Sequence, residues 1–198
     1  MKKRRFIRDN KGMSLVELII VIAIIAVLTT VSMVTMTIMH GAKAKDASMS
    51  FESRIAELQS KQRGQIVVCK TSESDDTLIQ QNDYRYATKL YVIGEKAYVM
   101  DSIAIKNNPS AEADYNDDLI DEKINDGLGT CLSQYVEVIY YDADGNKKEL
   151  KNGDCVYVCF DKSGACISGD GRYDFIKKSS GNVISSVTIN KNGSIQMK

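Results

Sequence analysis

The chain begins with an unbroken uncharged stretch that lies close to its N-terminus. It runs from Leu18 to Met39, and its first part, Leu18–Leu28, is apolar at every position. At about 1.5 Å per residue, a helix of this length covers roughly 33 Å, close to the ~30 Å hydrocarbon core of a bilayer. Its threonines are compatible with a spanning helix, because their hydroxyls can bond to helix carbonyls. The pattern therefore predicts a transmembrane helix.

The helical pattern continues beyond this stretch with a single apolar face. Apolar residues recur there at spacings of three and four, which is the period of one helix face. They are Ala44, Ala47, Phe51, Ile55 and Leu58. We predict one helix over 14–63, with its transmembrane part at 13–39 and an extracytoplasmic continuation at 40–64. Gly64 is expected to end it as a left-handed cap.

After the helix the apolar period changes to two, which is typical of half-buried strands. Strands are expected at Lys89–Ile93, Lys96–Met100, Tyr135–Tyr141, Cys155–Phe160, Gly164–Ser168, Val183–Asn190 and Ser194–Met197. Turns are expected at Gly94-Glu95, Asp144-Gly145, Lys162-Ser163 and Asn192-Gly193. Residues 107–129 look like an acidic loop. The predicted fold class is α+β: a long N-terminal transmembrane helix followed by an antiparallel β-sheet domain over 65–198.

Charge is balanced overall but unevenly distributed. The chain has 26 Lys and Arg against 26 Asp and Glu. Residues 1–12, however, hold six cations against Asp9 alone and carry a net charge of +5. A short cationic head before an apolar run keeps the N-terminus in the cytoplasm. We therefore expect a single-pass protein with a cytoplasmic N-terminus and an extracytoplasmic C-terminal domain.

Glu17 places a carboxylate at the start of this apolar sequence. A charged side chain inside a spanning helix costs about 2.5–3.5 kcal/mol on insertion scales, and it usually marks a partner or a function. The alternative is that Glu17 lies at the membrane interface and complements the positive start of the helix.

The segment Lys11–Leu28, KGMSLVELIIVIAIIAVL, resembles the processing site of type IV prepilins and pseudopilins, including those of type II secretion and competence systems. The resemblance covers roughly residues 1–40. It implies cleavage of a basic leader (1–12) after Gly12 and N-methylation of Met13. It also implies that Glu17, the fifth mature residue, meets the amino terminus of a neighbouring subunit. Met13 replaces the frequent Phe and Val34 replaces the Pro of many major pilins, which favours a minor pilin or a pseudopilin.

The function implied by this resemblance is that of a structural subunit of a type IV pilus or of a type II secretion or competence pseudopilus. Its partners would be other pilin or pseudopilin subunits, a prepilin peptidase/N-methyltransferase, an inner-membrane assembly platform and membrane lipid. It would lie in the bacterial cell membrane or in a surface filament, with no cofactor. The balanced charge argues against nucleic acid as a partner. A nucleic-acid partner stays open only for a competence pilus. The alternative is a membrane-anchored extracytoplasmic binding module that does not polymerise and keeps residues 1–12.

Two further classes explain the sequence less well. A secretory signal peptide would use the A-x-A match at Ala42-Lys43-Ala44, but typical apolar regions of signal peptides span only 7–15 residues. An enzyme would need a nucleophile and a base. The single histidine, His40, is isolated along the sequence from the cysteines, so we expect no Cys–His pair and no catalytic site.

Five cysteines follow the membrane segment, where disulfides are permitted. A turn at Lys162-Ser163 would place Cys159 opposite Cys166, so these two are candidates for a disulfide. Cys155 lies on the same strand as Cys159, roughly 13 Å away, so Cys131 is its more plausible partner. Cys69 is then the odd cysteine.

No metal site is predicted. The cysteine spacings lack the paired Cys-x₂-Cys arrangement that zinc sites use. The sequence Asp142, Asp144, Asn146 resembles the start of a calcium loop, but Lys147 occupies the sixth position, where that loop requires Gly. A hairpin turn explains this segment better. The acidic runs Glu73–Asp76 and Asp117–Glu122 are expected to be solvated loops.

Overall fold

One long helix opens the fold, as the sequence predicts. A computed structural model of the protein describes residues 14–72, 75–81, 84–94, 97–106 and 130–198. Helix α1 spans Leu15–Gly64. The chain divides into two compact units, Met1–Met39 and His40–Lys198. The boundary between them falls within α1, and each unit is described separately below.

In the first unit, α1 is apolar on all sides. Its large hydrophobic side chains up to Met39 are 40–75% exposed. The most apolar window of the helix has a mean hydropathy of 2.8, and none of that window is buried. The hydroxyls are satisfied internally, as predicted: Thr29 Oγ1 donates to the Ala26 carbonyl at 2.9 Å, and Ser32 Oγ donates to the Leu28 carbonyl at 2.9 Å. By length and composition, this helix can cross a membrane.

In the second unit, one face of α1 is buried. The predicted apolar positions Ala44, Ala47, Phe51, Ile55 and Leu58 are all buried, together with Ser48 and Gln62. The predicted left-handed cap at Gly64 is wrong, because Gly64 is not among the glycines with positive φ. Instead, the Gln65 N–H donates to the Lys61 carbonyl at 2.8 Å. The last turn therefore keeps helical hydrogen bonding through Gly64.

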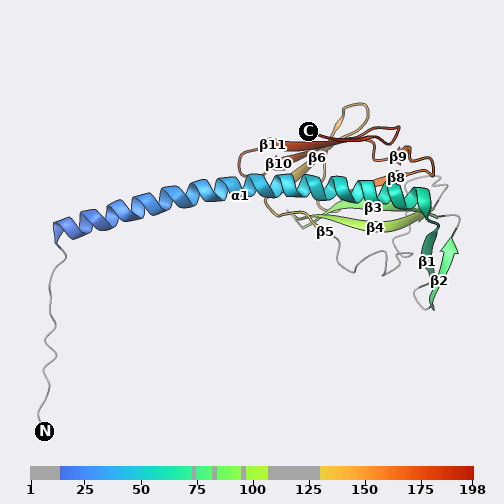
Figure 1. The fold of residues 1–198 in the computed structure, drawn as a ribbon, viewed down its shortest axis with the longest axis horizontal. Coiled ribbons are helices and arrows are strands. Elements are labelled where there is room, and N and C mark those ends of the chain that lie inside the picture. Colours follow the sequence, from blue (N-terminus) through green and yellow to red (C-terminus); the bar gives the residue numbers. More distant parts are fainter. Residues whose placement is uncertain (1–13, 73–74, 82–83, 95–96, 107–129) are drawn as a thin grey trace, which may run out of the picture. The chain divides into compact units, whose positions relative to one another are not determined.

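Antiparallel strands make up the rest of the second unit (Figure 1). They are β1 (Val67–Ser72), β2 (Asp75–Gln81), β3 (Tyr84–Ile93), β4 (Ala97–Lys106), β5 (Thr130–Cys131), β6 (Val136–Tyr141), β7 (Lys147–Glu149), β8 (Cys155–Phe160), β9 (Cys166–Ser168), β10 (Gly171–Lys177), β11 (Asn182–Ile189) and β12 (Ile195–Met197). Among the described residues they form a β1-β2 hairpin and two five-stranded sheets, ordered β12-β11-β10-β6-β7 and β5-β4-β3-β8-β9.

The expected antiparallel, α+β architecture is confirmed, but the sheet is divided in two. Local hairpins account for several pairings, including β3 with β4 and β10 with β11. Two pairings join distant segments: β8 adds to β3, and β10 adds to β6. The predicted two-residue turn at Gly94-Glu95 is wrong, because Ile93 pairs with Ala97 and the connection has three residues. The acidic loop predicted at 107–129 lies outside the described residues.

The core lies where both sheets meet the buried face of α1. The Phe51 ring packs against Tyr173 and Phe175 of β10, with ring centroids 4.7 and 5.7 Å apart. The other sheet contributes fully buried Leu90 and Phe160 to the same cluster. At 25 cal/mol per Å² of buried apolar area, aromatic side chains of this size dominate the stability of a small core.

Side-chain hydrogen bonds connect α1 to both sheets. The Gln59 Nε2 donates to the Gly164 carbonyl at 2.7 Å and to the Gly193 carbonyl at 2.8 Å. Gly164 lies in the β8–β9 turn and Gly193 in the β11–β12 turn, so a single amide bridges the two sheets. Gly193 has φ of 83°, and a Cβ there would collide with the Gly164 carbonyl. Glycine is therefore required at this crossing.

Candidate processing and assembly segment

Glu17 lies in the first turn of α1. The helix begins at Leu15, and the Leu18 N–H donates to the Ser14 carbonyl at 3.1 Å. Ser14 is thus the N-cap, and Glu17 is the third helical residue. Ser-x-x-Glu is the capping-box pattern, in which the glutamate reaches back towards the backbone at the cap. The sequence Ser14-Leu15-Val16-Glu17 shows this pattern directly, but we did not predict it.

Glu17 is electrostatically isolated along the helix. It is exposed, and the next charged side chain along the sequence is Lys43. Ion pairs within a helix need a cation three or four residues away. No residue from 18 to 42 supplies one. A cation for Glu17 must therefore come from the chain before Ser14 or from another molecule.

The predicted processing residues Gly12 and Met13 lie outside the described residues. Their position in the sequence still limits the chemistry. The bond between them precedes Leu15, the first helical residue, by two positions. Cleavage there would create an α-ammonium group one residue before the N-cap. That group would stand four residues from Glu17.

Comparison with known proteins identifies this segment. Residues 7–33 match the family model described as "Prokaryotic N-terminal methylation motif". The match contains Gly12, Met13 and Glu17, and it supports the recognition of the chain as a type IV prepilin or pseudopilin. The motif thus supports a pilin-like precursor that a prepilin peptidase processes. It suggests a structural subunit rather than an enzyme. Comparisons with curated proteins and with solved structures gave no significant match.

The helix that follows the motif agrees with a membrane-anchored protein. It is the one candidate membrane span found among the described residues. A helix that is hydrophobic on every side requires lipid or other helices around it. The motif and the helix therefore point to the same segment of the chain as the functional one.

The predicted pairing of Cys131 with Cys155 is wrong. Cys131 pairs with Val99, Val99 with Tyr91, and Tyr91 with Cys155. The two cysteines therefore lie in one row of the sheet with β4 and β3 between them. At about 4.8 Å per strand they are roughly 14 Å apart, whereas the Cα atoms of a disulfide lie within about 7 Å.

The predicted opposition of Cys159 and Cys166 is also wrong. The register pairs Phe160 with Cys166 and Cys159 with Ser168, with an irregularity between Cys159 and Phe160. The turn sets this offset, because the Asp161 N–H donates to the Ala165 carbonyl at 2.9 Å, which leaves residues 162–164 in the turn in place of the predicted Lys162-Ser163. The irregularity then shifts the pairing by one further position. Cys131, Cys155, Cys159 and Cys166 are all free thiols in the structure. Burial raises the pKa of Cys159 to about 11 and that of Cys166 to about 12.

The segment with a calcium-like spacing forms the predicted hairpin turn. Asp142 Oδ1 accepts hydrogen bonds from the backbone N–H groups of Asp144 at 3.0 Å and Asn146 at 2.8 Å. Gly145 has φ of 85°, and its N–H donates to the Asp142 carbonyl. These hydrogen bonds lower the pKa of Asp142, the largest effect coming from Asn146. Where the structure describes side chains, it shows no group of three metal-ligating residues.

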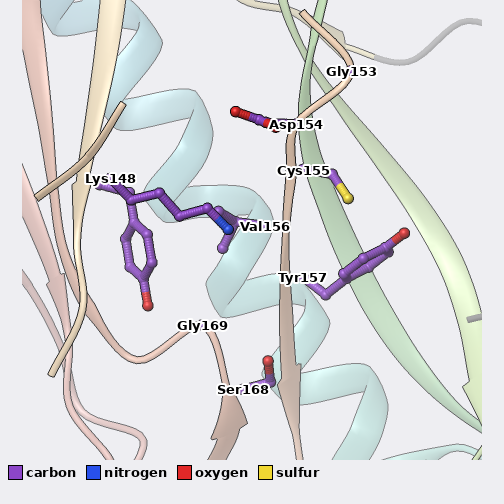
Figure 2. A pocket seen from close by; sticks show the side chains of 9 residues that line it. Lys148, Gly153, Asp154, Cys155, Val156, Tyr157, Ser168 and Gly169 are labelled. Atoms are coloured by element: carbon purple, nitrogen blue, oxygen red, sulfur yellow. The ribbon is translucent and has the colours of Figure 1, made fainter. Parts of the chain in front are cut away.

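A cavity of about 460 Å³ lies between the two sheets (Figure 2). Tyr140 and Lys148 line one side, and residues 153–157 of the β8 segment line the other. The Tyr140 hydroxyl donates to the Asp170 carbonyl at 2.7 Å, and burial raises its pKa to about 12. Figure 2 shows Cys155 and Tyr157 on one side of β8 and Lys148 on the other. The thiol and the amine therefore do not converge on a shared reacting position.

Proposed function

We propose that the chain is a structural subunit of a type IV pilus or of a type II secretion or competence pseudopilus. A prepilin peptidase cuts it after Gly12, Met13 is N-methylated, and subunits assemble by packing of their N-terminal helices. The observation that carries this proposal is the methylation motif at 7–33 joined directly to a helix that is apolar on every side. The motif accounts for the removal of the basic leader, and the apolar helix accounts for the packing of subunits against one another.

Glu17 is the assembly residue in this proposal. A carboxylate with no cation three or four positions away on its own helix is costly in an apolar environment. The α-ammonium of Met13 in a neighbouring subunit supplies the opposite charge once helices pack together. Methylation of that amine keeps its positive charge, so the pair survives the modification. In the monomer, Glu17 has only the weak stabilisation that the positive start of α1 gives to a carboxylate in its first turn.

The proposal is tested by Glu17→Ala. The variant should insert into the membrane as the native chain does, because insertion depends on the apolar stretch. Its incorporation into filaments should fall more than tenfold, because losing one member of a buried ion pair costs about 3 kcal/mol or more. The measurement compares the amounts of variant and native chain in sheared filaments and in membranes, in cells expressing both.

Glu57→Ala is the matched control. Glu57 lies on the same helix, is itself exposed, and forms ion pairs with Lys61 at 2.7 Å and with the half-buried Arg54 at 3.6 Å. Exposed pairs of this kind contribute little, so this variant should assemble normally. Equal assembly of the Glu17→Ala chain and the native chain would overturn the role of Glu17.

A further inference from the structure

The second unit has a basic surface at the end where α1 enters it. Lys43 and Lys45 lie in the first turn after His40, and both are exposed. Lys178 is exposed in the turn that connects β10 to β11. We call residues Lys177–Ile184, which form this turn and its flanks, the basal hairpin.

Tyr135 holds the basal hairpin beside the start of the helix in this unit. The Tyr135 ring stacks on His40, with ring centroids 4.2 Å apart and planes at 18°. The Lys178 N–H donates to the Tyr135 carbonyl at 3.1 Å. Lys177 pairs with Val136, the next residue along. The basal hairpin contacts Tyr135, and Tyr135 in turn contacts His40. Figure 1 shows the β10–β11 connection at that end of the sheet.

The basal hairpin also exposes apolar side chains. Val183 is 51% exposed and Ile184 is 40% exposed. Phe175 pairs with Ser185 whereas Ile176 pairs with Val183, so Ile184 is the extra residue of a β-bulge. Binding to a membrane surface grows with the apolar area buried and with attraction to anionic lipid, and this hairpin offers exposed apolar side chains beside the exposed Lys178.

Among the described residues, the carboxylates at this end are fewer than the exposed lysines. Asp46 directly follows Lys45, and Glu137 lies on β6 at the position that pairs with Ile176. Lys43, Lys45 and Lys178 are exposed, whereas Lys177 is buried, so three exposed lysines stand against these two described carboxylates. The balance of charge at this end therefore favours an anionic partner.

We infer that the basal hairpin, with Lys43 and Lys45, docks on the anionic headgroups of a lipid bilayer. This inference rests on the proposed function only in requiring that α1 crosses a bilayer up to Met39. His40 follows Met39 directly, so the residues in contact with His40 lie within reach of headgroups. Each lysine near an anionic surface contributes about 1 kcal/mol. Val183 and Ile184 add apolar contact at the boundary between headgroups and acyl chains.

The test uses the full chain inserted into lipid nanodiscs made either of phosphatidylcholine alone or of phosphatidylcholine with phosphatidylglycerol. Hydrogen exchange, read by mass spectrometry, follows the amides of residues 178–184. They should exchange several-fold more slowly in the anionic discs. Lys178→Gln should weaken docking about fivefold, the loss expected for one lysine, and 0.5 M salt should reduce the protection by screening.

Lys191→Gln is the matched control, because Lys191 is an exposed lysine in the turn after the opposite end of β11. It removes the same charge and should leave exchange at 178–184 unchanged. Val183→Asn tests the apolar contribution and should also reduce the protection. Thermal unfolding of each variant establishes that it is folded.

The outcomes separate the two proposals. A chain that does not insert into either disc overturns the membrane-spanning role itself. A chain that inserts but exchanges equally in both lipids overturns the docking inference alone. Protection that appears only as subunits become concentrated, whatever the lipid, also overturns it, since the surface would then contact a second copy of the chain.

Discussion

At the scale of single residues, the buried cysteines show how environment sets chemistry. Cys159 and Cys166 are 2% and 4% exposed, whereas Cys131 is on the surface. Burial disfavours the charged thiolate, so the pKa of each buried thiol lies above that of a thiol in water. The thiolate is the nucleophile and the species that forms disulfides. Because both thiols stay protonated at neutral pH, they are unreactive there.

This difference in pKa predicts how stability depends on pH. The unfolded chain loses the thiol protons near pH 9, whereas the folded chain holds them up to about 11 and 12. The contribution of these thiols to the free energy of unfolding should therefore be constant well below pH 9 and fall as the pH rises through 9, by on the order of 1 kcal/mol per thiol between pH 9 and 10. Denaturant titrations followed by tyrosine circular dichroism measure this.

Cysteine variants isolate the effect from other groups that titrate in this range. Cys166→Ala should show a shallower fall than the native chain, while Cys131→Ala, at the surface, should keep the native slope. A native slope in Cys166→Ala would contradict the assignment to this thiol.

At the scale of elements, α1 was predictable because its signals are local. The apolar stretch and the spacing of Phe51, Ile55 and Leu58 lie within the helix itself. Glu17 was predictable for the same reason, because the residues on both sides of it in the sequence belong to the methylation motif. Strand β10 was missed because it contains three charged residues, Arg172, Asp174 and Lys177, which break the apolar alternation. Asp174 and Lys177 are buried, and Asp174 pairs with Arg172 at 3.0 Å.

The cysteine pairings failed for a different reason. They depend on the order of strands in a sheet, and β8 joins β3 through a pairing between distant segments. A spacing rule along one strand does not contain this information. One additional residue in the β8–β9 turn, where Asp161 bonds to Ala165, is enough to place Phe160 and not Cys159 opposite Cys166.

The packing of α1 on the sheets predicts a large effect for Phe51→Ala. Phe51 is fully buried against Tyr173 and Phe175. Its truncation should lower the free energy of unfolding of the second unit by about 3–5 kcal/mol, through lost apolar burial and the cavity left behind. Met49→Ala, at a 39% exposed position on the same helix, should change it by less than about 1 kcal/mol. Denaturant midpoints of the full chain in detergent compare the two, and equal effects would contradict this packing.

At the scale of the whole molecule, the proposed cleavage after Gly12 would change the charge distribution. Residues 1–12 carry a net charge of +5 and the rest of the chain −5. Their removal would take away the cationic residues before the helix and leave an acidic chain whose first helical turn holds Glu17.

Intact mass of the membrane-extracted chain should therefore match a protein beginning at Met13, with about 14 Da added for one methyl group. Gly12→Leu should leave the precursor uncut, because a bulky side chain blocks the cleavage position, whereas Asn10→Ala in the same leader should be processed normally. Retention of residues 1–12 in cells that contain an active prepilin peptidase would contradict the processing and favour the anchored module that does not polymerise.

The amide of Gln59 has a mechanical consequence. In the proposed filament, tension along α1 would reach both sheets through the hydrogen bonds of Gln59 to the carbonyls of Gly164 and Gly193. The tension would then be distributed over the β8–β9 and β11–β12 turns, and strands would not separate from the sheet one at a time. Losing this one side chain would leave the core intact and yet weaken the globular unit against tension.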